Sequence, residues 1–197
     1  MTCTDAAVLC EASSKGACFA RYGSCSPRKH GMREAGVRVL LYCVSQMAVR
    51  YKKVITPLIS FFSDFYFRIF VQVKHSPKAA LEVVHNVSLV PSCVNCQYYH
   101  LQKLQDHVTV LIDKCPVCKS SLKILGPIWN KDIDKLEFVD MLLTELKSFD
   151  FKTNDKIYGL LVGKKDELES GTPPLGVYMR QIISEIKSNS PNLKTIM

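Results

Sequence analysis

The sequence predicts an α/β fold in which helices cover a sheet and a cysteine cluster binds a metal ion. Three observations lead to this prediction. Apolar residues recur at helical spacing from about Gly31 to Tyr51, as in one long amphipathic helix. Side chains alternate over 65–73, as in a strand with one face in the core. Two Cys-x-x-Cys pairs lie between Cys93 and Cys118.

Length and composition limit the class of protein. With 197 residues, 47% of them hydrophobic, the chain can bury a core of one domain or slightly more. It has no run of about eighteen uncharged apolar residues, so we expect no membrane span. Its first residues lack a basic stretch followed by an apolar one, so we expect no signal peptide. Nine cysteines, an odd number with four in paired units, indicate a reducing compartment rather than a disulfide scaffold.

Positive charge is concentrated near the N-terminus. The net charge is +8, and residues 1–53 hold nine Lys and Arg against three acidic residues. A polyanion such as nucleic acid is the partner expected for such a segment, although a solvated basic face is the alternative. The predicted helix carries Arg33, Arg38 and Arg50 on its polar face, so part of the basic patch is helical.

Two apolar runs, 54–62 and 65–73, give the convincing strands of the sheet. In the second run Phe67 and Ile69 fall on the face predicted to lie in the core, while Arg68 is expected to be buried on the other face. Strands of nearly continuous apolar content indicate a sheet covered by helices. Only two or three strands can be identified in this way.

The paired cysteines predict a structural zinc site formed by Cys93, Cys96, Cys115 and Cys118. Four thiolates satisfy a tetrahedral zinc ion, and each Cys-x-x-Cys turn directs two sulfurs at one centre. The eighteen residues between the pairs suffice for a hairpin with 108–112 as one strand. Such a site leaves no position for substrate, so its zinc is not catalytic.

Other interpretations of this region stay open. The four thiols could be ordinary buried cysteines or redox pairs. His100 and His107 lie between the pairs and could replace a ligand, or could simply be solvated.

Helices are predicted after the cysteines. Asp132 is placed to cap a helix, and the apolar face of that helix is Ile133, Leu136, Val139, Leu143 and Leu146. Its outer face is expected to be acidic through Asp134, Glu137, Asp140 and Glu145. A further helix is predicted from about 172–174, and Ser190-Pro191 would begin another.

Several motifs occur in the order seen in one enzyme family. They are TCTDAAVLC at 2–10, RYGS at 21–24, RYKKVITPLIS at 50–60, DFYFRIFVQV at 64–73, the paired cysteines and LGPIWN at 125–130. In this respect the chain resembles the tRNA (guanine(26)-N2)-dimethyltransferase family over roughly residues 2–180. The resemblance implies a class I methyltransferase that uses S-adenosylmethionine to methylate the exocyclic amine of a guanine in tRNA.

The resemblance also implies a domain organisation and a location. Residues 1–90 would form the C-terminal part of the methyltransferase sheet, 91–130 the zinc element, and 131–197 the start of a mainly helical C-terminal domain that helps to hold tRNA. Family members are found in the nucleus and in mitochondria.

The chain departs from the family pattern at the catalytic motifs. It contains no Asp-Pro dipeptide and no Gly-x-Gly cofactor loop, both of which precede the TCTD stretch in the family. We therefore expect an internal fragment that is inactive or very weakly active alone, with no catalytic residue to assign.

Candidate binding residues follow from charge and from the resemblance. Thr4 and Asp5 would lie at the end of a strand, where open α/β folds place ligands, so they are candidates for the cofactor side, or else begin a helix. The candidates for RNA binding are Arg21, Tyr22, Arg28, Lys29, Arg50, Lys52 and Lys53. Tyr22 could stack on a base or could serve in packing.

Two other classes of protein compete with the enzyme. A zinc-stabilised, non-catalytic RNA-binding module would explain the cysteines and the charge. A structural or partner-binding protein stapled by zinc would explain the core, but it predicts no preference for tRNA over other polyanions.

Overall fold

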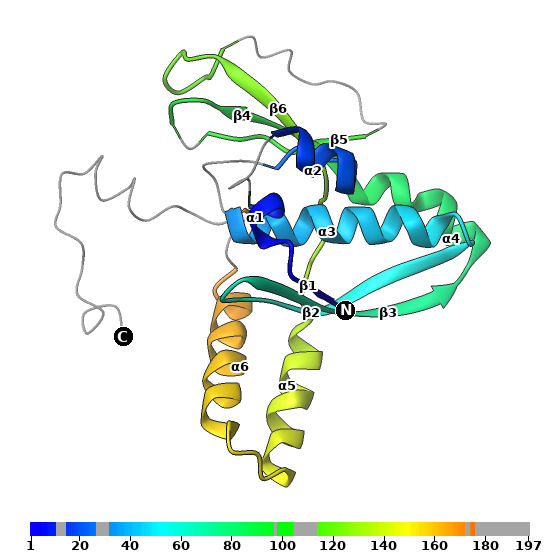
Figure 1. Cartoon of the computed structure of the whole chain (residues 1–197), viewed down its shortest axis with the longest axis vertical. Helices are drawn as coiled ribbons and strands as arrows, with labels where there is room; N and C mark the ends of the chain where they lie inside the picture. The colour runs from blue at the N-terminus through cyan, green and yellow to red at the C-terminus, as the bar shows by residue number, and fades with distance from the viewer. Residues whose placement is uncertain (11–14, 27–31, 97, 105–113, 172–173, 176–197) are drawn as a thin grey trace, which may run out of the picture.

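The structure is a computed structural model that describes residues 1–10, 15–26, 32–96, 98–104, 114–171 and 174–175. It has two three-stranded sheets, and helix α3 (Met32–Val49) packs against β2 (Lys53–Ser63) of one sheet and β6 (Leu122–Trp129) of the other. Figure 1 shows α3 running between the two sheets, with a pair of helices projecting below them. The predicted α/β class is confirmed, but the strands form two small sheets rather than one.

The first sheet has the order β1-β3-β2 and is antiparallel throughout. Strand β1 (Thr2–Cys3) pairs with the beginning of β3 (Tyr66–His75), and β2 pairs with β3 along its whole length. The register of the hairpin shifts between Pro57 and Ile59, a β-bulge that interrupts the ladder at Leu58. Two short helices, α1 (Ala6–Leu9) and α2 (Lys15–Tyr22), lie between β1 and α3 in the chain.

The second sheet has the order β5-β4-β6 and is also antiparallel. Strand β4 (Val87–Cys93) is its centre, with β5 (Gln102–Lys103) on one side and β6 on the other. The short helices α4 (Pro77–Leu81) and η1 (Glu82–Asn86) lead into it from β3. The predicted strand at 108–112 lies outside the described residues.

The main core lies where α3 meets both sheets. Phe67 of β3 and Ile128 of β6 are fully buried there together with Val39 and Leu41 of the helix. A side chain at position 36 would clash with the core, because its Cβ atom would lie 2.7 Å from Cζ of Phe67. The long helix predicted from about Gly31 to Tyr51 is confirmed over Met32–Val49, and its close approach to Phe67 depends on a glycine.

Arg38 and Arg68 are not where the sequence pattern placed them. Arg38, expected on the polar face, is only 5% exposed, and its guanidinium donates to the carbonyls of Trp129 and Lys131 and to the carboxylate of Glu34. It therefore ties α3 to the end of β6. Arg68, expected to be buried, is exposed, and it donates to Oγ1 of Thr2 across the sheet.

The helix pair consists of α5 (Leu136–Glu145) and α6 (Asn154–Glu169), joined by the short η2 (Leu146–Ser148). The predicted cap at Asp132 is wrong, because residues just before α5 bond to strand β2 instead of forming a helical turn. Lys135 N–H donates to the carbonyl of Leu58, which the bulge leaves free, and Asp134 accepts from Ser60. The helix consequently begins only at Leu136.

The prediction for Asp134 in the same segment is also wrong. It was expected on an exposed acidic face, but it is 7% exposed and accepts from both N–H and Oγ of Ser60, at 2.6 and 2.9 Å. Its other oxygen lies 3.2 Å from Nζ of Lys164 on α6. Asp134 therefore connects the sheet to both helices of the pair.

Helix α6 was not predicted, while the predicted helix from 172–174 and the start at Ser190-Pro191 lie almost wholly outside the described residues. Leu175 is described, and it is buried in the main core with its N–H donating to Glu34. Among the described residues, no helix is long and apolar enough to cross a membrane.

Candidate metal centre and nucleic-acid surface

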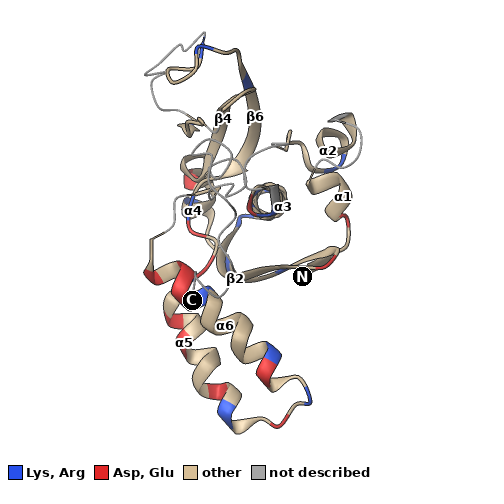
Figure 2. Cartoon of the chain, turned by 90° about the vertical axis from the view of Figure 1, so that its left-hand side faces the viewer, with Lys and Arg blue, Asp and Glu red and all other residues tan. Residues whose placement is uncertain are grey.

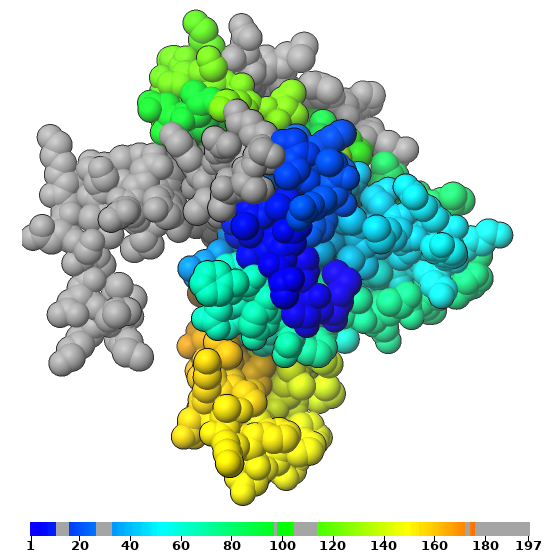
Figure 3. Space-filling model, in the orientation of Figure 1, coloured from blue at the N-terminus to red at the C-terminus, as the bar shows by residue number. Residues whose placement is uncertain are grey.

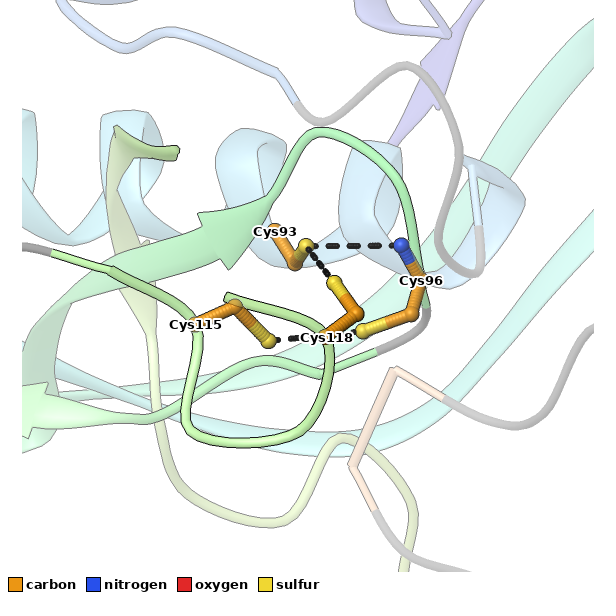
Figure 4. A group of neighbouring side chains, drawn as sticks. All are labelled: Cys93, Cys96, Cys115 and Cys118. Atoms are coloured by element: carbon orange, nitrogen blue, oxygen red, sulfur yellow. Dashed lines mark hydrogen bonds between the residues drawn. The ribbon is translucent and has the colours of Figure 1, made fainter. Parts of the chain in front are cut away.

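The four paired cysteines converge at one end of the second sheet. Cys93 is the last residue of β4, and Cys96 follows in the turn beyond it. Cys115 and Cys118 lie in the turn that leads into β6, which brings them beside the first pair because β6 is the neighbour of β4. Figure 4 shows the four side chains directed toward one another.

The distances between the sulfurs suit a single metal ion. All four Sγ atoms lie within 4.8 Å of one another, and the pairs Cys93–Cys118 and Cys96–Cys115 are each 3.4 Å apart. A tetrahedral zinc ion with bonds of about 2.3 Å places its sulfurs about 3.8 Å apart. These four cysteines form no disulfides. The residues therefore fit zinc, as the spacing predicts, and zinc binding itself stays a prediction.

Backbone N–H groups are directed at the sulfurs of the first pair. The N–H groups of Asn95 and Cys96 both approach Sγ of Cys93 at 3.3 Å, and that of Tyr98 approaches Sγ of Cys96 at 3.4 Å. The turn thus wraps its backbone around the sulfurs that would bind the metal.

The thiols of the cluster have very different proton affinities. Hydrogen bonds from the hydroxyl and backbone of Ser120 lower the pKa of Cys118 to about 5. Burial raises the pKa of Cys96 to about 12. Burial acts in the same direction on Cys115, but N–H donors in its own turn and the neighbouring thiols lower its pKa overall. Protons are thus unequally shared in the cluster, and a divalent ion would replace them.

Thr4 and Asp5 follow the short strand β1. Thr4 is exposed, while one oxygen of Asp5 accepts from Nη1 of Arg21 at 2.7 Å and from the hydroxyl of Tyr22 at 3.0 Å. The carbonyl of Asp5 also accepts from N–H groups of the first turn of α1. A role of Thr4 and Asp5 on the cofactor side stays a prediction, with Asp5 already engaged by two residues predicted to bind RNA.

Arg21 and Tyr22 are at the end of α2. The Arg21 side chain is 59% exposed, whereas Tyr22 is half-buried and its hydroxyl lies 3.4 Å from Sγ of Cys3. Burial, together with the hydrogen bonds to Cys3 and Asp5, raises the pKa of Tyr22. These contacts favour the packing interpretation of Tyr22 and leave Arg21 available to solvent.

The remaining RNA-binding candidates lie elsewhere. Arg50 and Lys52 are exposed in the turn between α3 and β2, and Lys53 is exposed at the start of β2. Figure 1 shows where α3 leads into β2. Arg28 and Lys29 lie outside the described residues, as does His107. His100 is half-buried beside β4, where its backbone N–H donates to the carbonyl of Pro91.

A hollow of about 550 Å³ lies between the β2–β3 hairpin and the helix pair. Aromatic side chains from both parts line it, among them Phe61, Phe138, Phe149 and Phe151. The rings of Phe149 and Phe151 are stacked with their centroids 5.3 Å apart. The hollow was not predicted from the sequence, and neither Thr4 nor Asp5 lines it.

Comparisons with known proteins agree with the motifs. The family described as N2,N2-dimethylguanosine tRNA methyltransferase matches residues 1–197. Similar proteins include tRNA (guanine(26)-N(2))-dimethyltransferase 1 of Arabidopsis thaliana, 30% identical over 97% of this chain and 34% of that protein. The corresponding enzymes of Homo sapiens and Methanothermobacter thermautotrophicus are 29% and 26% identical over 98% and 100% of the chain, and over 31% and 50% of their own lengths.

A solved structure has the same fold. It is the complex of Trm1 from Pyrococcus horikoshii with S-adenosyl-L-methionine, which matches with a TM-score of 0.70 and 22% identity over 83% of this chain and 41% of that one. The chain thus spans about a third to a half of the length of the relatives it matches.

Proposed function

Because the chain belongs to the N2,N2-dimethylguanosine tRNA methyltransferase family, we propose that it forms part of an enzyme that methylates the exocyclic amine of guanine 26 in tRNA. The observation that carries this proposal is the family match over all 197 residues. The convergence of the four paired cysteines supports it, because they lie within the matched region.

The proposed methyl donor is S-adenosylmethionine. The Pyrococcus horikoshii Trm1 structure, which shares the fold, was solved with this compound. Methyl transfer requires the donor and the amine to be held at near-attack distance, which needs a cofactor loop and a residue that accepts the guanine. Since the 197 residues contain no Gly-x-Gly loop and no Asp-Pro dipeptide, we expect the chain alone to be inactive or very weakly active.

The chain would contribute scaffold and RNA contact. In this proposal residues 1–90 complete a methyltransferase sheet, 91–130 form a zinc element and 131–197 begin a domain that holds tRNA. Strand β4 starts at Val87, so a zinc element defined by contacts would begin slightly earlier than residue 91. Four thiolates at the metal leave no position for substrate, so the proposed zinc stabilises the second sheet and takes no part in the reaction.

The cellular location is inferred from the relatives. The similar protein of Saccharomyces cerevisiae is named as mitochondrial. We propose the mitochondrion or the nucleus for the protein described here, and imaging of a fluorescent fusion would distinguish the two.

A second candidate is a non-catalytic RNA-binding module. It is favoured by the closed cysteine cluster and by the exposed Arg21, Arg50, Lys52 and Lys53. Such a module would bind RNA with an affinity like that of the proposed enzyme part. It would not support methyl transfer when a cofactor-binding half is added.

One experiment tests the proposal. Purified chain is incubated with labelled S-adenosylmethionine and unmodified tRNA, its zinc content is measured, and tRNA binding is measured in competition with heparin. We expect zinc, preferential binding of tRNA and no methyl transfer until the corresponding cofactor-binding half of a relative is added. Methyl transfer by the chain alone would contradict the assignment of scaffold residues, and loss of tRNA to heparin would contradict the proposal as a whole.

A further inference from the structure

The second sheet carries a basic surface that lies outside the positively charged N-terminal quarter. The described residues of this sheet and its turns, 87–96, 98–104 and 114–130, hold four lysines and no carboxylate. Three of the lysines, Lys114, Lys119 and Lys123, belong to the turn with the second cysteine pair and to the start of β6. All three are exposed.

Backbone contacts hold these lysines on one compact turn. Lys114 pairs with Ser121 as an isolated bridge, and the N–H of Cys115 donates to the carbonyl of Ser120 at 2.8 Å. The N–H of Lys119 donates to the carbonyl of Cys115 at 2.9 Å, and Lys119 has a positive φ of 61° that closes the turn. The backbone positions of Lys114 and Lys119 are therefore fixed relative to each other by the knuckle.

Lys123 lies on the face of the sheet that is turned toward α3. It pairs with Ser92, while Leu125, two residues further along, pairs with Val90 and packs against the main core. Alternate residues of a strand share a face, so Lys123 extends the core-facing side of β6 past the end of the covered region.

The segment after α2 borders the edge of β6. Cys25 and Gly126 form a backbone bridge with hydrogen bonds of 2.9 and 2.8 Å in the two directions. The guanidinium of Arg21 is paired with Asp5, just after β1, so the lysines of the second sheet form a basic surface separate from it.

A simpler role for the lysines is to balance the metal centre. Zinc bound by four thiolates has a net charge of −2, and nearby ammonium groups would stabilise it. In that case the lysines would affect metal affinity, and RNA affinity would be unchanged. The two roles make opposite predictions for one triple variant.

We propose that the turn 114–123 is a phosphate-binding surface, which contacts the RNA backbone through Lys114, Lys119 and Lys123. This inference rests on the proposed function, since it names where the RNA lies on the chain. A metal-ordered turn suits the task, because lysines held in place lose less conformational entropy on binding than lysines on a flexible loop.

The test compares two variants with equal loss of charge. In the first, Lys114, Lys119 and Lys123 are changed to Ala. In the control, three exposed lysines outside this turn, Lys74, Lys78 and Lys103, are changed to Ala. The dissociation constant for tRNA is measured from about 50 to 200 mM salt, and the zinc content of each variant is measured by elemental analysis.

We expect the first variant to bind at least tenfold more weakly at the lowest salt. Its plot of log affinity against log salt should be flatter by about 0.7–0.9 for each phosphate group that the variant no longer neutralises. The control should keep both the affinity and the slope of the unchanged chain. Zinc content should be equal in all three proteins.

Other results overturn the inference. Equal losses in both triple variants would mean a response to net charge alone, and reduced zinc with an unchanged slope would mean that the lysines balance the metal centre. If the unchanged chain binds tRNA and the first variant binds equally well, the inference fails while the proposed function stands. If the unchanged chain does not bind tRNA, both fail.

Discussion

Different contacts stabilise the second sheet, which carries the cysteine cluster, and the helix pair. At the end of the second sheet four thiols meet in a turn of few apolar residues, and the neighbouring charges are lysines. The helix pair instead has an apolar seam around Val139, Leu161 and Ile59, with Asp134 and Lys164 buried beside it. Figure 2 shows acidic residues along α5 and α6.

From this difference we infer which of the two regions depends on a ligand for its stability. Residues 131–171 contain ten carboxylates and seven lysines, so the helix pair is an acidic element. Figure 3 shows it as a projection at the lower end of the molecule, and its apolar side chains pack on one another and on Ile59 of β2. The knuckles have little to bury, since Pro116, Val117 and Lys119 are exposed. We therefore expect the second sheet to need its metal and the helix pair to need its buried ion pair.

The largest expected effect is loss of the metal. Changing Cys93 or Cys115 to Ser should unfold the second sheet around 87–130, because a structural zinc site contributes on the order of 10 kcal/mol to a small element. Hydrogen exchange should increase there and on the side of α3 that packs on β6, less so in the β2–β3 hairpin, and elemental analysis should show no zinc.

Cys25→Ser is the matched control, since Cys25 is exposed and takes part in its bridge only through its backbone. It should keep zinc and melt as the unchanged chain does. Equal melting of the Cys93→Ser variant and the unchanged chain, with no zinc in either, would show that the cluster holds buried thiols only.

A smaller effect is expected at Asp134. Its replacement by Ala removes both hydrogen bonds to Ser60 and leaves the half-buried Lys164 paired with Glu167 alone. Breaking a buried ion pair on one side costs about 3 kcal/mol. Urea unfolding should show this loss, whereas Asp132→Ala, at an exposed position, should change stability by less than about 0.5 kcal/mol. Equal effects of the two changes would contradict the assigned role of Asp134.

The same ion pair predicts a dependence on pH. Burial by itself would lower the pKa of Lys164, but Asp134 and Glu167 raise it overall above its usual value of 10.5. A group with a raised folded pKa stabilises the fold fully below its unfolded pKa, and this contribution disappears as pH rises through the folded pKa. Stability of the helix pair should fall above about pH 10.5, and Lys164→Met should show a smaller fall. An equal fall in both proteins would assign it to other groups.

The cysteine cluster could be predicted because each pair of cysteines lies close together in the sequence. Each Cys-x-x-Cys turn places its two sulfurs within three residues, so only the meeting of the turns depended on the fold. The long helix and the β2–β3 hairpin were predictable for the same reason, since their periodic patterns are continuous along the chain.

The errors concern residues whose partners are distant in the sequence. Arg38 bonds to carbonyls 91 and 93 residues away, and Asp134 bonds to Ser60, so neither charge follows the polar-face rule. Helix α6 was missed because Gly159 and Gly163 weaken its propensity and only Leu161 is fully buried. Its stability comes from packing against α5, which no pattern within the segment reports.

The smallest expected effect concerns the turn after α3. Arg50, Lys52 and Lys53 are changed together to Gln, which keeps the side-chain stems and removes three charges from exposed positions. If this turn touches RNA at the edge of the contact, tRNA affinity should fall by about 1 kcal/mol, or about fivefold, and the salt slope should become slightly flatter. Because the turn carries no metal to fix it, the fall in affinity should be smaller than that of the Lys114, Lys119 and Lys123 variant under the same conditions. A larger fall in tRNA affinity would place the main RNA contact at the end of α3 rather than at the second sheet.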